Sequence, residues 1–177
     1  MKRSVLRWEL VGIGVIFVAG SLFHFLFDWS GGFQPVGVIA AVNESVWEHF
    51  KIAFWPALIY AIIEYPFLRR HVNNFFIAKA IGLYVMPAAI AAIFYAYTAI
   101  SGEEILAVDI TIFFVAVALG QFASYKILTL RQWPRRLCWV GAVMVVLLAV
   151  AFGVFTFYPP HLCIFRDAVS GGYGIIP

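Results

Sequence analysis

Five long apolar stretches, separated by more polar segments, dominate the pattern of the chain. They cover about residues 8–28, 46–68, 75–99, 104–128 and 137–158, and a more polar tail follows at 159–177. An α-helix rises about 1.5 Å per residue, so each stretch is long enough to cross a hydrocarbon core of about 30 Å. The pattern predicts an all-α integral membrane protein, with a single transmembrane domain of five helices.

Basic residues are unevenly distributed between the two sides that alternate threading of these spans defines. Of the twelve Lys and Arg residues, all but Lys51 and Arg166 fall on the side of the N-terminus. Because Lys and Arg in short loops set orientation, we expect the N-terminus inside and the C-terminus outside. The net charge of +3 is explained by this topology, so it does not indicate nucleic-acid binding. Membrane lipid is the expected partner.

The connection between the first two spans, Ser30–Asn43, is unusual. It begins with turn-forming residues, and its apolar part, Val36–Val42, is far too short to cross a membrane. The segment therefore predicts a short re-entrant or interfacial element on the outer side. Re-entrant backbone is tolerated only against protein or a water-filled cavity, so we also expect a cavity that opens outward.

Polar side chains able to bind a metal gather near the predicted outer ends of the first two spans. His24 and Asp28 are four residues apart and stack on one helix face, as a metal pair or as a simple interfacial pair. Residues 43–49 read Asn-Glu-Ser-Val-Trp-Glu-His. Ser45 and Glu48 fit a capping box at a helix start, which leaves Glu44 and His49 without a structural explanation.

Further candidates follow later in the chain. His161 comes directly after two prolines, which could fold the tail across the outer surface, although a disordered tail is the alternative. We interpret these residues as one outer site with a divalent metal, zinc being favoured. The expected metal ligands are His24, Asp28, His49 and His161. The expected catalytic bases are Glu44 and Glu48, and the supporting residues are Asp109, Asp167 and Cys163.

The Asn-Glu-Ser-x-Trp-Glu-His segment, His24-x-x-x-Asp28 and the Pro-Pro-His near the end resemble a family of small bacterial membrane proteins of unknown function. This resemblance covers most of the chain and implies location in the bacterial cytoplasmic membrane. A more distant chemical analogy is to alkaline-ceramidase-like membrane hydrolases, which hold zinc with a Ser, an Asp and several histidines. Here Ser21 and His24 are three residues apart instead of four, and the paired later histidines are missing.

Three functions are compatible with this pattern. The first is a metal-dependent hydrolase that acts on a lipid or lipid-linked substrate at the outer leaflet, with an acid as general base for water. The second is a proton or cation channel or transporter component, in which Asp109, Gln121 and Glu64 line a path. The third is a non-catalytic membrane scaffold or sensor whose polar residues are helix caps and interfacial pairs.

Overall fold

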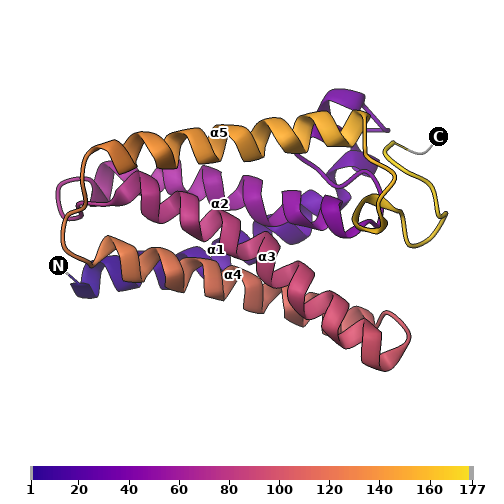
Figure 1. The fold of residues 1–177 in the computed structure, drawn as a ribbon, viewed down its shortest axis with the longest axis horizontal. Helices are drawn as coiled ribbons and strands as arrows, with labels where there is room; N and C mark the ends of the chain where they lie inside the picture. Colours follow the sequence, from indigo (N-terminus) through magenta and orange to yellow (C-terminus); the bar gives the residue numbers. More distant parts are fainter. Residues whose placement is uncertain (1, 176–177) are drawn as a thin grey trace.

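The computed structural model describes residues 2–175, and in this part of the chain it contains helices and no strand. All five α-helices are long and apolar enough to cross a membrane, which confirms the number of spans predicted from the sequence (Figure 1). The elements in chain order are α1 (Lys2–Trp29), η1 (Gln34–Val38), α2 (Val46–Leu68), α3 (Phe75–Ser101), α4 (Leu106–Leu128), α5 (Arg136–Phe157) and η2 (Cys163–Phe165).

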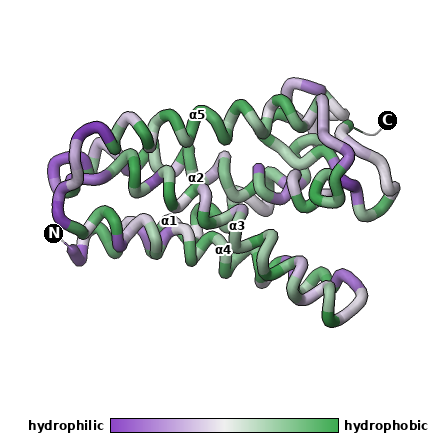
Figure 2. The backbone as a smooth tube through the Cα atoms, in the orientation of Figure 1, coloured by the Kyte–Doolittle hydropathy of each residue, from purple (hydrophilic) through white to green (hydrophobic). Residues whose placement is uncertain are grey.

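The five helices run along the long axis of the molecule and form one bundle with two polar ends. The start of α1 and the α2–α3 and α4–α5 loops lie at one end, which we call the N-terminal end (Figure 1). The α1–α2 connection, the α3–α4 turn and the tail lie at the other, the C-terminal end. Figure 2 shows hydrophilic residues concentrated at both ends and hydrophobic residues between them. Which end faces the outside stays a prediction from the basic residues.

Small residues bring the helices of the bundle into close contact. At the crossing of α3 and α4, a Cβ atom added to Gly120 would lie 2.8 Å from the carbonyl oxygen of Gly82. On α1, a Cβ at Gly20 would collide with the backbone of α2 at Ile52 and with Phe113 of α4. Small residues allow such approach where the hydrophobic effect no longer drives helix association. α1 therefore packs tightly against both α2 and α4.

Two irregular segments cover the C-terminal end of the bundle. The 3₁₀ helix η1 packs against α1 and α5, and its Gly37 is buried. The tail folds back over the same end, where Phe165 is buried and its ring centroid lies 4.8 Å from that of Trp47. Asn43 Nδ2 donates a hydrogen bond of 2.8 Å to the carbonyl oxygen of Gly174. The described part of the tail therefore packs against the bundle, and the membrane depth of η1 stays a prediction.

Candidate functional site

Two histidines face each other from neighbouring helices at the C-terminal end. His24 lies near the end of α1, and His49 lies near the beginning of α2. Because α1 and α2 are successive helices of opposite direction, the end of one meets the start of the other. The two ring centroids are 5.2 Å apart.

Glu44, just before α2, places its carboxylate between the two rings. Its Oε2 atom is 3.3 Å from His24 Nε2 and 3.5 Å from His49 Nε2. One ligand atom from each of the three residues can be chosen so that all lie within 4.8 Å of one another. We call these three residues the His–Glu–His cluster. The side chain of Glu44 is 45% exposed, so the cluster is open to a ligand from outside.

Hydrogen bonds from the chain hold Glu44 in this position. Its backbone N–H donates to Asp167 Oδ1 at 2.7 Å, which ties it to the folded tail. Next to it, Ser45 N–H donates to Asn43 Oδ1 at 2.8 Å. The Ser45 hydroxyl then accepts from the N–H of Glu48 at 3.4 Å and caps α2, which is the Ser45 half of the predicted capping box. The other half does not form, because the Glu48 carboxylate accepts from the Val42 N–H instead. Glu44 is therefore fixed from both the helix start and the tail.

The hydrogen bonding of His49 places two acceptor atoms opposite each other in the cluster. His49 Nδ1 lies 2.9 Å from the carbonyl oxygen of Ser45, and a carbonyl only accepts hydrogen bonds, so Nδ1 carries the hydrogen. On a neutral ring Nε2 is then an acceptor, and it faces the carboxylate of Glu44, which is also an acceptor. A proton on the ring or a metal ion between the two groups satisfies both. Metal-binding histidines commonly donate their other N–H to a carbonyl in this way.

Three carboxyl groups around the cluster differ in the direction in which their pKa values are shifted. The hydrogen bond with His24 holds the pKa of Glu44 below its ordinary value of 4.5, despite partial burial. Burial opposes ionisation of Asp167, but donors from Ser170 and from the Glu44 N–H outweigh it, so its pKa is also lowered. Glu104 is the opposite case, because burial and the charges of Asp109, Glu44 and Asp167 raise its pKa. Of these three carboxyl groups, Glu104 is the one whose pKa is shifted toward neutral pH.

A cavity of about 540 Å³ opens beside the cluster. The His–Glu–His cluster lines part of its wall, and Glu104 and Asp109 line another part. Most of the remaining lining is apolar and includes Phe25, Ile90, Phe94, Leu106 and Phe113. A second, more polar cavity of about 500 Å³ shares Glu44 and Glu104 with the first, and Cys163, Arg166 and Asp167 also line it. Polar and apolar compartments therefore meet at Glu44.

The structure brings together only part of the predicted ligand set. His24 and His49 converge, and the third residue of the cluster is Glu44, which we expected as a catalytic base. Asp28 is exposed one helical turn beyond His24 and is outside the group within ligand distance. His161 is exposed, and its ring stacks on Tyr173 with centroids 4.5 Å apart. Within residues 2–175, neither Asp28 nor His161 joins the cluster.

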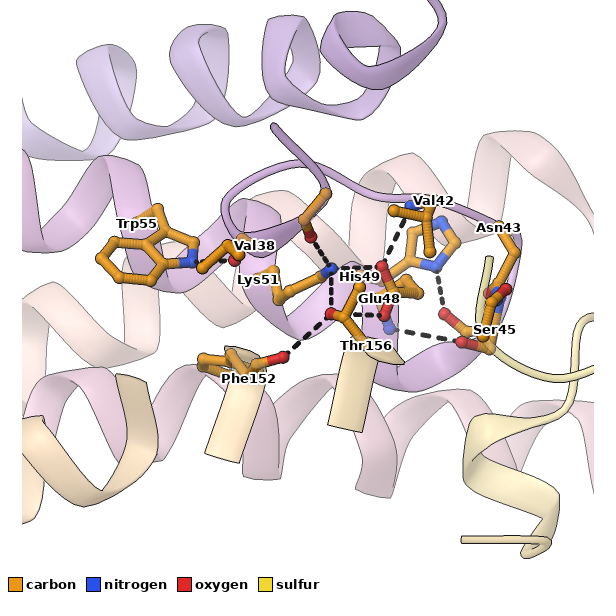
Figure 3. A network of polar contacts seen from close by, with 12 residues as sticks. Val38, Val42, Asn43, Ser45, Glu48, His49, Lys51, Trp55, Phe152 and Thr156 are labelled. Carbon is orange, nitrogen blue, oxygen red and sulfur yellow. Dashed lines mark hydrogen bonds and ion pairs between the residues drawn. The ribbon is translucent and has the colours of Figure 1, made fainter. Parts of the chain in front are cut away.

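Glu48, expected as a catalytic base, belongs to a separate buried network (Figure 3). Its side chain is 2% exposed and forms an ion pair of 2.5 Å with Lys51, which is fully buried. Lys51 Nζ also donates to the Gly37 carbonyl at 2.6 Å and to Thr156 Oγ1 at 2.7 Å. Glu48 in turn accepts from the Val42 N–H at 3.0 Å. Lys51 therefore links α2 to η1 and α5, and Glu48, its buried ion-pair partner, is not among the residues that line the two cavities.

The supporting residues have distinct positions. Asp109 lines the first cavity and accepts a hydrogen bond of 2.6 Å from the hydroxyl of Tyr97. Asp167 and Cys163 line the second cavity, and Cys163 is a free, exposed thiol. Ser21, which we compared together with His24 to the Ser and His of the alkaline-ceramidase-like hydrolases, donates a hydrogen bond of 2.9 Å to the Phe17 carbonyl of its own helix. Glu104 lines both cavities, although we did not select it from the sequence. The one feature of the sequence that pointed to it was its position at the predicted outer end of the fourth span.

Comparison with known proteins identifies the family of the chain but not its activity. No curated protein and no solved structure matches the chain. A family model described as a family of unknown function, DUF6512, matches residues 1–175. The chain therefore belongs to the DUF6512 family, whose function is not known.

Proposed function

We propose that the protein is a metal-dependent hydrolase that acts on a lipid or lipid-linked substrate at the outer face of the bacterial cytoplasmic membrane. One observation carries this proposal: His24, Glu44 and His49 converge on one side of a cavity. Two histidines and one glutamate form a ligand set known from catalytic zinc sites, in which a fourth position stays open. The acceptor atoms that face each other in the cluster fit such an ion.

The residues of the cluster and the cavity would have three different roles in hydrolysis: metal binding, proton transfer and orientation. Nε2 of His24, Nε2 of His49 and Oε2 of Glu44 would hold the metal, and such an ion supplies Lewis acidity toward a carbonyl or phosphoryl oxygen. Glu104, with its raised pKa, would give or take the proton. Asp109 keeps its carboxylate oriented through the Tyr97 hydroxyl. Glu104 replaces Glu48 in this role, since Glu48 is buried against Lys51.

The shape of the site favours an amphiphilic substrate. Aromatic and aliphatic side chains from α1, α3 and α4 line the first cavity and suit an acyl chain. The second cavity offers charged groups from Arg166, Glu104 and Asp167 to a polar head group. Glu44 lines both cavities, so the bond between head group and chain would lie beside the metal ligands.

Metal content is the first test. Protein purified without chelator should contain about one divalent metal ion per chain by elemental mass spectrometry. His24→Ala, His49→Ala and Glu44→Gln should each lose at least about tenfold in zinc affinity, whereas His161→Ala should retain the wild-type value. Wild-type affinity in all three cluster variants would refute the assignment.

Hydrolysis is the second test. Metal-loaded protein in lipid nanodiscs should release product from at least one of an ester, an amide and a phosphoester lipid, as followed by mass spectrometry. Glu104→Gln should reduce the rate about 10²–10⁴-fold with metal still bound, and the exposed neighbour Glu103→Gln provides the matched control. Absence of product from all three lipid classes with fully loaded protein would contradict the hydrolase proposal.

A further inference from the structure

Three charged side chains are buried together in the N-terminal half of the bundle, away from the His–Glu–His cluster. Glu9 of α1, Glu64 of α2 and Lys79 of α3 are 2%, 0% and 7% exposed. Lys79 Nζ lies 2.7 Å from Glu9 Oε1 and also forms an ion pair with Glu64. We call these residues the Glu–Lys–Glu triad.

The groups that surround the triad are neutral. From α4, the Ser124 hydroxyl donates to Glu9 Oε1 at 3.0 Å, and Gln121 Nε2 donates to the backbone carbonyl of Glu9 at 3.3 Å. The nearby phenol of Tyr60 donates to the carbonyl oxygen of Trp8 at 2.6 Å. Within residues 2–175, Lys79 is the one cation within ion-pair distance of either carboxylate. Two acids therefore share a single basic partner.

The charge of the triad does not balance if all three groups are ionised. Two carboxylates and one ammonium leave one uncompensated negative charge among groups that are almost completely buried. An unpaired charge in an apolar interior costs several kcal/mol, which protonation avoids. In addition, the Oε2 atoms of Glu9 and Glu64 are buried without a hydrogen-bond partner. These two oxygens are the places that a proton can occupy.

We propose that the Glu–Lys–Glu triad is a proton-binding site, in which Glu9 and Glu64 share one bound proton at neutral pH and make the triad electrically neutral. Two acids that share one proton are a known arrangement of close carboxyl pairs. The site is independent of the metal cluster, because it lies at the opposite part of the helices and shares no residue with it.

Infrared spectroscopy can measure the predicted number of protonated Glu side chains in the triad. The carbonyl stretch of a protonated carboxylic acid is separate from that of a carboxylate, and labelling with ¹³C-glutamate assigns it to Glu. At neutral pH the wild-type triad should show one protonated Glu. Glu9→Gln and Glu64→Gln should each remove this band completely, because either remaining acid is neutralised by Lys79 alone. Lys79→Met should raise the count to two.

Glu9→Gln and Glu64→Gln each leave one Glu paired with Lys79, so the triad stays neutral, and Gln has nearly the same volume as Glu. Both variants should therefore fold, which circular dichroism can check. The exposed Glu103→Gln is the matched control and should leave the band unchanged. A wild-type spectrum without a protonated Glu, or a band that persists in both single variants, would overturn the proposal. A sodium ion in place of the proton would also overturn it: the band would be absent, and sodium would raise the thermal stability of the wild type but not of Glu64→Gln.

Discussion

Replacement of Lys51 by methionine removes the charge at the centre of the buried network below the C-terminal end. The Lys51 ammonium contacts Glu48, the Gly37 carbonyl and the Thr156 hydroxyl within 2.5–2.7 Å. Methionine fills a similar volume but donates no hydrogen bond. The variant therefore leaves the Glu48 carboxylate, which is 2% exposed, without its counter-charge.

The expected cost follows from this geometry. Removal of one partner from a buried ion pair typically costs about 3–5 kcal/mol, because the other charge stays buried and unpaired. We expect Lys51→Met to lower the free energy of unfolding by this amount. The double variant Lys51→Met, Glu48→Gln leaves no charge, so it should recover at least half of the loss.

Reversible unfolding in mixed micelles, followed by tryptophan fluorescence, measures these differences. Lys126→Met provides a control, since Lys126 is exposed at the other end of the bundle. A Lys51→Met variant that stays within about 1 kcal/mol of the wild type, or a double variant no more stable than the single one, would refute the expected cost of the unpaired Glu48 charge.

Three further predictions concern the cluster and the helix packing. Because the pKa of Glu44 is lowered, its ion pairs should stabilise the fold above its ordinary value of 4.5 and be lost as the pH falls through the lower folded-state value; an acid titration of Glu44→Gln that matches the wild type would contradict this. Gly120→Val should cost about 1–3 kcal/mol of unfolding free energy by overpacking, whereas Gly14→Val, with open space around it, should cost less than 1 kcal/mol of packing energy by the same micelle assay. Asp167→Asn should weaken zinc binding severalfold in a competition assay, because the Glu44 N–H loses a charged acceptor; unchanged affinity would show that the tail does not position Glu44.

The helices were predictable because span length and apolar content are properties of the sequence alone. The start of α2 was also predictable, since Ser45 has the cap chemistry and the structure places the helix directly after it. The C-terminal end of α3 was not predicted as closely: we expected the span to end at residue 99, but the helix continues to Ser101 and ends at Gly102, which takes a φ of 76°.

The candidate site was only partly predictable. His24, Glu44 and His49 were identified because antiparallel neighbours bring the end of one helix to the start of the next. Asp28 lies on the same helix as His24, but it is one helical turn further along and therefore lies outside the His–Glu–His cluster. The stacking of His161 on Tyr173 depends on how the tail folds, which no local spacing encodes.

The buried ion pairs were the least predictable feature. Glu48 and Lys51 are three residues apart, yet only the surrounding packing shows that Gly37 and Thr156 enclose them. Glu9, Glu64 and Lys79 come from three helices, and a single sequence does not reveal which faces of these helices meet. Long-range contacts, rather than local pattern, therefore decide which acids are available for chemistry.

X-ray absorption spectroscopy of the zinc-loaded protein tests the central claim most directly. The account predicts two imidazole nitrogens at about 2.0–2.1 Å and one carboxylate oxygen at about 2.0–2.2 Å around the metal, with the imidazole signal reduced to one ring in His24→Ala. A spectrum with sulfur at about 2.3 Å, or with oxygen ligands alone, would contradict the cluster of His24, Glu44 and His49 as the metal centre.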